Sequence, residues 1–146
     1  MPAAELVAFR LAANACAATM RDSASYVERE LPSVTVAVPH RQAIVRVGEL
    51  LMANWFDIRT ELDELAALGL PANSDTVQRR VERIHRWLGE HLPDIDRVVT
   101  ALSSAARDDR DCSGAFILVS ESVANVLVSF AEVTRARERY EQACGK

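Results

Sequence analysis

Two arginine–histidine pairs near the middle of the chain have side chains that could transfer protons. Arg80 precedes His85 by five residues, and Arg86 precedes His91 by the same interval. A histidine can act as a general acid or base near neutral pH, and a neighbouring arginine can stabilise developing negative charge. We therefore take His85, Arg80, His91 and Arg86 as candidate catalytic residues.

The spacing Arg-x-x-x-x-His in residues 80–91 is similar to the catalytic motif of HEPN ribonucleases, which are also small all-helical domains. The resemblance implies that Arg80 with His85, or Arg86 with His91, cleaves RNA by acid–base catalysis at a dimer interface. The arginines are followed by Val81 and by a tryptophan, where that family usually carries a polar residue such as asparagine.

His85 also begins the sequence His-Arg-Trp-Leu-Gly, which partly resembles the motif of histidine phosphotransfer domains. The resemblance implies that His85 accepts a phosphoryl group. Gly89 would leave space beside the imidazole for the aspartyl phosphate of a partner, and a basic residue would steady the phosphoryl group. Leu88 stands where that family prefers a lysine or an arginine.

Metal and cofactor chemistry has little support in the sequence. Glu82 and His85 form one Glu-x-x-His, the spacing used by di-iron bundles, but such a site needs a second motif. His40 and His91 have no glutamate three residues before them, and the cysteines fit no zinc-site pattern. We expect no metal and no cofactor.

The composition is typical of one folded domain with an aliphatic interior. The 146 residues are 49% hydrophobic, 26% charged and only 5% aromatic, so we expect a single domain over residues 1–146. A net charge of -4 makes nucleic acid an unfavourable partner.

The sequence favours a cytoplasmic location without a membrane. Glu5 and Arg10 interrupt the apolar residues at the amino end, which argues against a secretory signal. The longest apolar stretch, residues 115–130, contains Glu121 and Asn125 and is too short to span a bilayer. The three cysteines lie too far apart on the expected helices to form a disulfide, which favours a reducing compartment.

Proline and glycine divide the chain into long helical segments. Apolar spacing predicts helices over residues 3–31 and 39–68, the second with Gly69 at its C-terminal cap. A third helix follows the candidate caps Asn73, Ser74 and Asp75 and is kinked or broken at Pro93. After a charged loop at 107–114, the last helix covers residues 114–143 with Ser113 as its cap. Residues 33–38 alternate like a strand, and we consider both a crossover that caps the core and a strand that pairs between chains. The fold class is therefore an all-α antiparallel four-helix bundle.

Charged stripes on the second and third helices predict that the two form a hairpin. Acidic and basic residues repeat at matching helical intervals on either side of a turn near Ala72. Apolar residues match in the same register. We read the arginines as structural partners of these carboxylates, with an anion-binding role as the alternative. The predicted pairs are Asp57 with Arg86, Glu61 with Arg83, and Glu64 with Arg79.

The last helix is apolar around much of its circumference, which indicates that it is either the central helix or part of an interface. We take Phe116, Val119, Val123 and Phe130 as candidate interface residues. The sequence therefore predicts a non-enzymatic interaction or adaptor module that binds a protein partner or a second copy of itself. The last helix is the first candidate for the interface, and the first helix is the second candidate. Two alternatives stay open: chemistry at His85, and a small-molecule sensor whose ligand fills the bundle core.

Overall fold

The computed structural model describes residues 2–145, and of residue 111 only the backbone. All regular secondary structure in this range is helical, and four of the helices pack against one another. The helices are α1 (Ala3–Glu30), α2 (Val38–Ala67), α3 (Asp75–Gly89), α4 (Leu92–Asp108) and α5 (Ser113–Ala143). Short 3-10 turns lie at Leu31–Ser33 and Arg110–Cys112.

Proline, glycine and one serine set the helix ends. Pro32 lies in the 3-10 turn after α1, and Pro39 lies in the first turn of α2, where no backbone N–H is needed. Gly69 follows α2 with a φ of 64°, a conformation that glycine adopts without strain. Ser74 caps α3, because its side chain accepts a hydrogen bond from the backbone N–H of Val77 at 3.3 Å.

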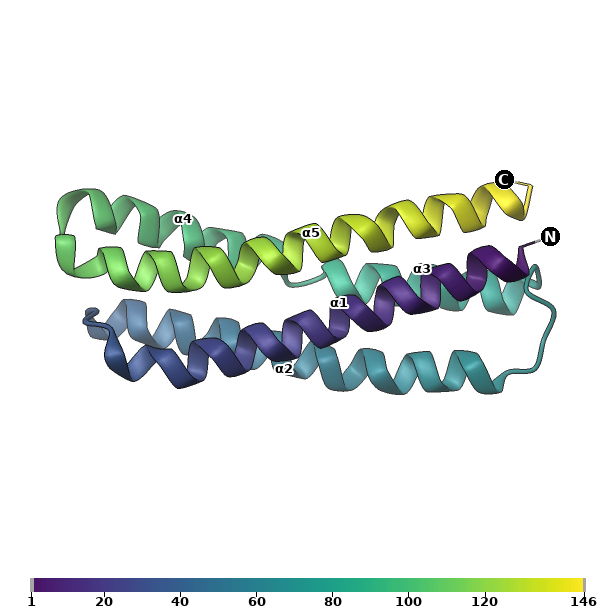
Figure 1. Ribbon diagram of the computed structural model, residues 1–146, viewed down its shortest axis with the longest axis horizontal. Helices are drawn as coiled ribbons and strands as arrows, with labels where there is room; N and C mark the ends of the chain where they lie inside the picture. Colours follow the sequence, from purple (N-terminus) through teal and green to yellow (C-terminus); the bar gives the residue numbers. More distant parts are fainter. Residues whose placement is uncertain (1, 146) are drawn as a thin grey trace.

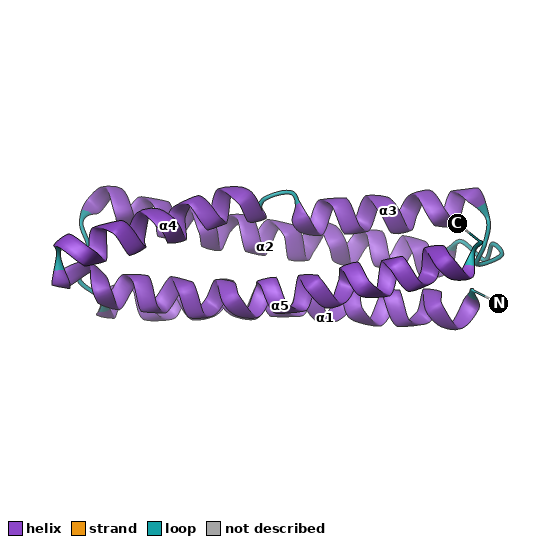
Figure 2. Ribbon diagram, turned by 90° about the horizontal axis from the view of Figure 1, so that it is seen from above, coloured by secondary structure: helices purple, strands orange, loops and turns teal. Residues whose placement is uncertain are grey.

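The segment predicted as a third helix is divided between two helices. α3 ends at Gly89, and α4 begins at Leu92 with Pro93 in its first turn. A proline ring clashes with the preceding turn of a helix and removes one N–H donor. Figure 2 shows α3 and α4 one after the other along the molecule, joined by a short link.

The connection between α1 and α2 crosses the end of the core. Residues 2–145 include no strand, so residues 33–38 pair with no strand of this chain. The backbone at Val34 is extended (φ -109°, ψ 142°), and the side chains of Val34 and Val36 are half-buried against the core. Within the chain, this segment is the crossover that caps the core.

The connection between α4 and α5 differs from the prediction. The expected charged loop at residues 107–114 is largely helical, because α4 continues to Asp108 and a 3-10 turn follows. Ser113 is the first residue of α5 and not its cap. Short 3-10 turns are frequent connectors at helix ends, and the run of charged residues in this segment was predicted as a loop for lack of any helical pattern.

The helices lie side by side along one long axis. In Figure 1, α1 runs from the end marked N, α2 runs back, α3 and α4 run out again, and α5 returns to the end marked C. α1 contacts both α2 and α5 along its length, while α5 also contacts α3 and α4. One side of α5 therefore meets α1, and another side meets α3 and α4.

The core is mostly aliphatic. Its largest fully buried side chains include two aromatic residues, Phe9 and Tyr140. The Tyr140 hydroxyl donates to the carbonyl oxygen of Ala72 at 2.5 Å, which ties the end of α5 to the turn between α2 and α3. The aliphatic members of this set are Met20, Val27, Ile44, Val47, Leu51, Ile58, Ile84, Leu88, Ile95 and Leu102. Each such side chain contributes about 1.5–3 kcal/mol through its burial.

Candidate functional site

A cluster of ion pairs joins α2 to α3. The carboxylate of Glu61 accepts from Arg83 at 3.0 Å and from Arg80 at 3.1 Å, and its side chain is only 9% exposed. Arg80 also reaches Glu64 at 2.8 Å, and this hydrogen bond raises the pKa of the Arg80 guanidinium above its usual value. The two arginines therefore compensate the negative charge of the nearly buried Glu61 carboxylate. Arg80, a member of the first candidate catalytic pair, is engaged in these ion pairs.

The partners in this cluster differ in part from the predicted ones. The predicted pair of Glu61 with Arg83 is formed, but Arg80 takes the position expected for Arg79. Arg79 is exposed, and its Nε donates to the carbonyl oxygen of Asp75 at 3.4 Å. Two predicted ion pairs are absent from residues 2–145: Glu64 with Arg79, and Asp57 with Arg86.

His85 lies against α5. Its ring stacks on Phe130 with 5.0 Å between the ring centroids, and its Nε2 is 2.9 Å from Oγ1 of Thr134. The Thr134 hydroxyl also lies 3.2 Å from the carbonyl oxygen of Phe130, to which it can donate. Burial and then the positive charge of Arg137 lower the pKa of His85.

The space beside His85 is filled from within the chain. A Cβ atom added to Gly89 would lie 2.7 Å from Cζ of Phe130, much closer than such atoms approach in proteins. Gly89 therefore permits the contact between the end of α3 and the Phe130 ring. This contact is a structural reason for a glycine four residues after His85, independent of any phosphoryl group.

The structure does not bring the members of the candidate catalytic pairs together. Arg80 points to the carboxylates of α2, whereas His85 contacts α5 on another side of α3. Arg86 is exposed, and His91 is half-buried just before α4. Within residues 2–145, no hydrogen bond or ion pair joins Arg86 to His91.

Other reactive groups are also poorly placed for chemistry. In the described part of the chain, no three His, Cys, Asp or Glu side chains are grouped so that they could hold a metal ion. Cys16 is buried, and desolvation raises the pKa of its thiol to about 11. The Cys16 thiol is therefore protonated and a poor nucleophile at neutral pH.

Two of the four expected interface residues on α5 lie in the core. Val119 and Val123 are 0% and 4% exposed, so they are not available to a partner. Phe116 and Phe130 are half-buried and pack against the core. This placement corrects the expected surface, because the apolar stripe that contains Val119 and Val123 is the one that faces the other helices.

α5 exposes other apolar side chains on its outer side. Ile117 is 53% exposed, Leu127 is 42% exposed and Val128 is 66% exposed. Only 33% of the most apolar part of α5 is buried. By length and composition alone, this helix could cross a membrane, although the core helix of a soluble protein meets the same criterion. Ile117 and Val128 are eleven residues apart, which is close to three full turns, so both lie on the side of α5 opposite the buried valines. This spacing was the sequence signal that could have identified the exposed surface.

An apolar groove lies between α1 and α2. It has a volume of about 540 Å³, and Gly48 lies in its wall. A Cβ atom at Gly48 would meet only the carbonyl oxygen of Ala24, at 4.0 Å, so no contact within the chain requires a glycine there. The apolar side chains that line the groove include Val27, Leu31, Ile44, Val45 and Met52, and its charged lining residues are Glu28, Arg41 and Glu49.

Comparisons with known proteins add no relationship. No family model matches the chain, and neither the curated proteins nor the solved structures include a match. The functional argument therefore rests on the surfaces described above.

Proposed function

We propose that the chain is a non-enzymatic interaction module of the cytoplasm, an antiparallel helical bundle that associates with itself through the outer side of α5. The observation that carries this proposal is the exposure of large apolar side chains on a helix that is otherwise central to the fold. Val128, at 66%, is the most exposed of them. Val128 is flanked on the same side of α5 by the exposed residues Ala124 and Ala131, and contiguous exposed apolar surface on a soluble protein typically marks an interaction site.

The first helix also exposes apolar side chains, but these border α2 and not α5. α1 lies beside α5, and its residues Val7 and Leu11 are 51% and 66% exposed. These two residues are one helical turn apart and therefore lie on one side of α1. Because they line a hollow with Arg59, Leu62 and Asp63 of α2, they form a separate exposed apolar site and do not extend the α5 surface.

A protein surface suits the outer side of α5 better than a lipid bilayer does. Glu121 is exposed on this side of the helix, a little more than one turn from Ile117 and two turns from Val128. An acidic side chain in the middle of a bilayer costs about 2.5–3.5 kcal/mol on insertion scales. A protein partner can offer a positively charged side chain to the Glu121 carboxylate, so Glu121 among the apolar residues favours a protein partner with a positive charge at this position.

Two valines of equal exposure allow a direct test. Val128 on α5 and Val38 at the start of α2 are both 66% exposed. We expect Val128→Glu to shift the protein to monomers in sedimentation equilibrium, whereas Val38→Glu leaves the association unchanged. A wild-type protein that stays monomeric at high concentration, that binds lipid vesicles as a monomer, or that responds equally to both variants would overturn the proposal.

A second candidate function is small-molecule sensing, which the groove between α1 and α2 favours. Gly48 in the interior of α2 lowers helix stability by about 0.8–1.0 kcal/mol relative to alanine, and no packing contact requires it. A ligand that needs the open space would be a reason for the glycine. A thermal-shift screen of apolar compounds against wild type and Gly48→Leu tests this function. Hits that bind both proteins equally would exclude the groove as the site.

A further inference from the structure

The outer side of α5 carries a stripe of six exposed residues whose spacing alternates between four and three. Such spacing keeps side chains on one face of a helix, as in helix pairs that pack along a seam. Small or apolar residues occupy the centre of the stripe, and charged residues lie toward its ends. The six residues are Ile117, Glu121, Ala124, Val128, Ala131 and Arg135.

The charges of this stripe are arranged symmetrically with opposite signs. Glu121 lies seven residues before Val128, and Arg135 lies seven residues after it. Each charge is therefore about 10 Å from Val128 along the helix axis. When a second copy of the helix runs in the opposite direction about a centre at Val128, each glutamate stands opposite an arginine.

From this symmetry we propose that α5 pairs with α5 of a second copy in antiparallel orientation, with the two-fold axis near Val128. This inference rests on the proposed self-association and specifies its geometry. Glu121 of each copy binds Arg135 of the other, so the interface contains two equivalent ion pairs. A parallel pairing would place Glu121 against Glu121 and Arg135 against Arg135, which is unfavourable.

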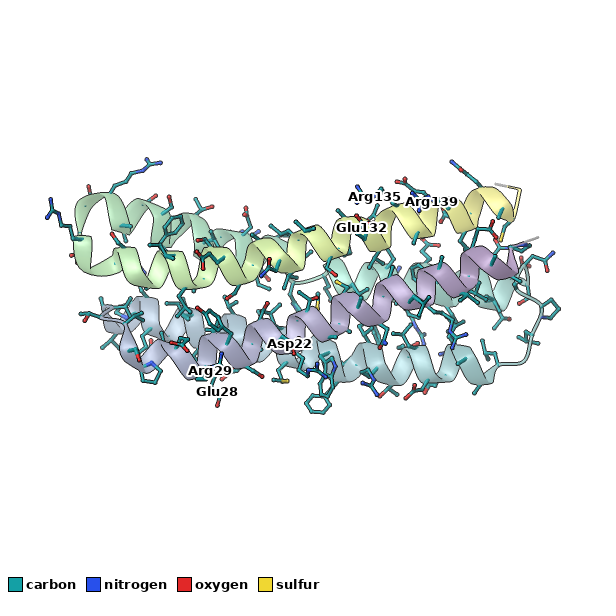
Figure 3. All side chains as sticks on the ribbon, in the orientation of Figure 1. Asp22, Glu28, Arg29, Glu132, Arg135 and Arg139 are labelled. Atoms are coloured by element: carbon teal, nitrogen blue, oxygen red, sulfur yellow. The ribbon has the colours of Figure 1, made fainter. Side chains whose placement is uncertain are left out.

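The surroundings of both side chains suit this contact. Arg135 is 53% exposed and pairs with Glu132 of its own helix, but a guanidinium has five N–H donors and can bind a second carboxylate. Figure 3 shows Glu132 and Arg135 along the outer edge of α5. Within residues 2–145, Glu121 has no ion pair, so its carboxylate is available.

The surface beside Glu121 also has room for a long side chain. α1 and α5 border a hollow of about 810 Å³ that extends to Glu121 and Val128. Asp22 lines the α1 side of this hollow, and Figure 3 shows it on α1. An arginine from the second copy would therefore approach a region with two carboxylates.

Charge reversal tests the orientation. In Glu121→Arg and in Arg135→Glu, two attractive contacts become repulsive, and we expect each variant alone to dimerise about thirty-fold more weakly. An equimolar mixture of the two variants restores both contacts in a heterodimer, so we expect wild-type affinity. Sedimentation equilibrium measures each variant alone, and native mass spectrometry identifies the heterodimer.

A second pair of the same geometry provides the control. Arg97 forms an i,i+3 ion pair with Asp94 on α4, as Arg135 does with Glu132. We expect Arg97→Glu, which changes the net charge equally, to leave dimerisation unchanged. If Val128→Glu abolishes association but the two charge variants fail to complement each other, the antiparallel pairing is wrong while self-association stands. If association survives Val128→Glu, both inferences fail.

Discussion

Two glycines in helices provide a test of the packing between α3 and α5. A glycine-to-alanine substitution in a helix usually raises stability by up to about 1 kcal/mol, because alanine restricts the unfolded chain and favours the helix. At Gly48 the new Cβ would have no neighbour closer than 4.0 Å, whereas at Gly89 it would lie 2.7 Å from Cζ of Phe130. We therefore expect the two substitutions to change the free energy of unfolding with opposite signs.

The magnitudes follow from helix propensity and overlap. Gly48→Ala should raise the free energy of unfolding by about 0.8–1.0 kcal/mol, which shifts the melting temperature by about 2–4 °C in a chain of this size. Forcing an extra carbon into a packed site costs about 1–3 kcal/mol. Because Gly89 is the last residue of α3, the gain in propensity there is small, and we expect a net loss of about 1–2 kcal/mol.

A double-mutant cycle assigns the loss at Gly89 to Phe130. In a Phe130→Ala background the overlap is absent, so Gly89→Ala should become neutral or mildly stabilising. Urea unfolding followed by circular dichroism, at one fixed protein concentration because association shifts stability, gives all four free energies. If Gly89→Ala stabilises the protein in both backgrounds, or destabilises both equally, Phe130 is not the reason for the glycine.

The remaining predictions concern Glu61, Tyr140 and His85. Glu61→Gln should lower the free energy of unfolding by about 2–3 kcal/mol, because two arginines lose a carboxylate that is only 9% exposed. Glu64→Gln is the control: the Glu64 side chain is 51% exposed, so this substitution should lower the free energy of unfolding by less than about 1 kcal/mol. Equal losses for the two variants in urea unfolding would contradict the role of the cluster. Tyr140→Phe should lower the free energy of unfolding by about 1 kcal/mol through the lost bond to Ala72, and an unchanged midpoint would argue against that bond. Because the pKa of His85 is lowered in the folded state, the unfolded chain binds protons more readily, so stability should fall from about pH 7 to pH 5, and His85→Gln should weaken this dependence.

The all-helical fold was accessible from the sequence because the helix ends have strong local causes. Pro39, Gly69 and Ser74 each act on the backbone within one turn, so their positions predict helix boundaries without knowledge of the fold. The second helix begins within one residue of its predicted start. At Ser113 the same reasoning was wrong, since a serine also fits the first turn of a helix and the preceding 3-10 turn has no comparable signal.

The partners of the charged side chains were less accessible. Helical spacing correctly placed Glu61 opposite Arg83, but it paired Glu64 with Arg79, whereas the structure pairs Glu64 with Arg80. Adjacent residues on a helix differ by about 100° around its axis, and long arginine side chains can span part of that difference. The choice depends on how α3 rotates against the core, which the buried residues Val77, Val81, Ile84 and Leu88 determine together.

The candidate chemistry at His85 illustrates the limits of a short motif. His85 and Gly89 are about one helical turn apart and so lie on the same side of α3. This spacing therefore fits a phosphotransfer motif and a packing contact equally well. Phe130, which lies forty-one residues after Gly89, supplies the contact, and no local pattern connects the two. Only the fold shows that α5 places an aromatic ring against both the imidazole and the glycine.

Similar reasoning explains why Val119 and Val123 were predicted as interface residues although they lie in the core. A helix that is apolar on two sides contains both a core stripe and an exposed stripe, and hydrophobicity alone does not distinguish them. Val123 and Val128 are the same residue type, yet they are 4% and 66% exposed. The exposed stripe is distinguished by charge, because it contains Glu121 and Arg135 on either side of Val128, whereas no charged residue occurs among the buried residues of α5. For a surface that pairs with itself, the positions of the charges are therefore more informative than the positions of the apolar residues.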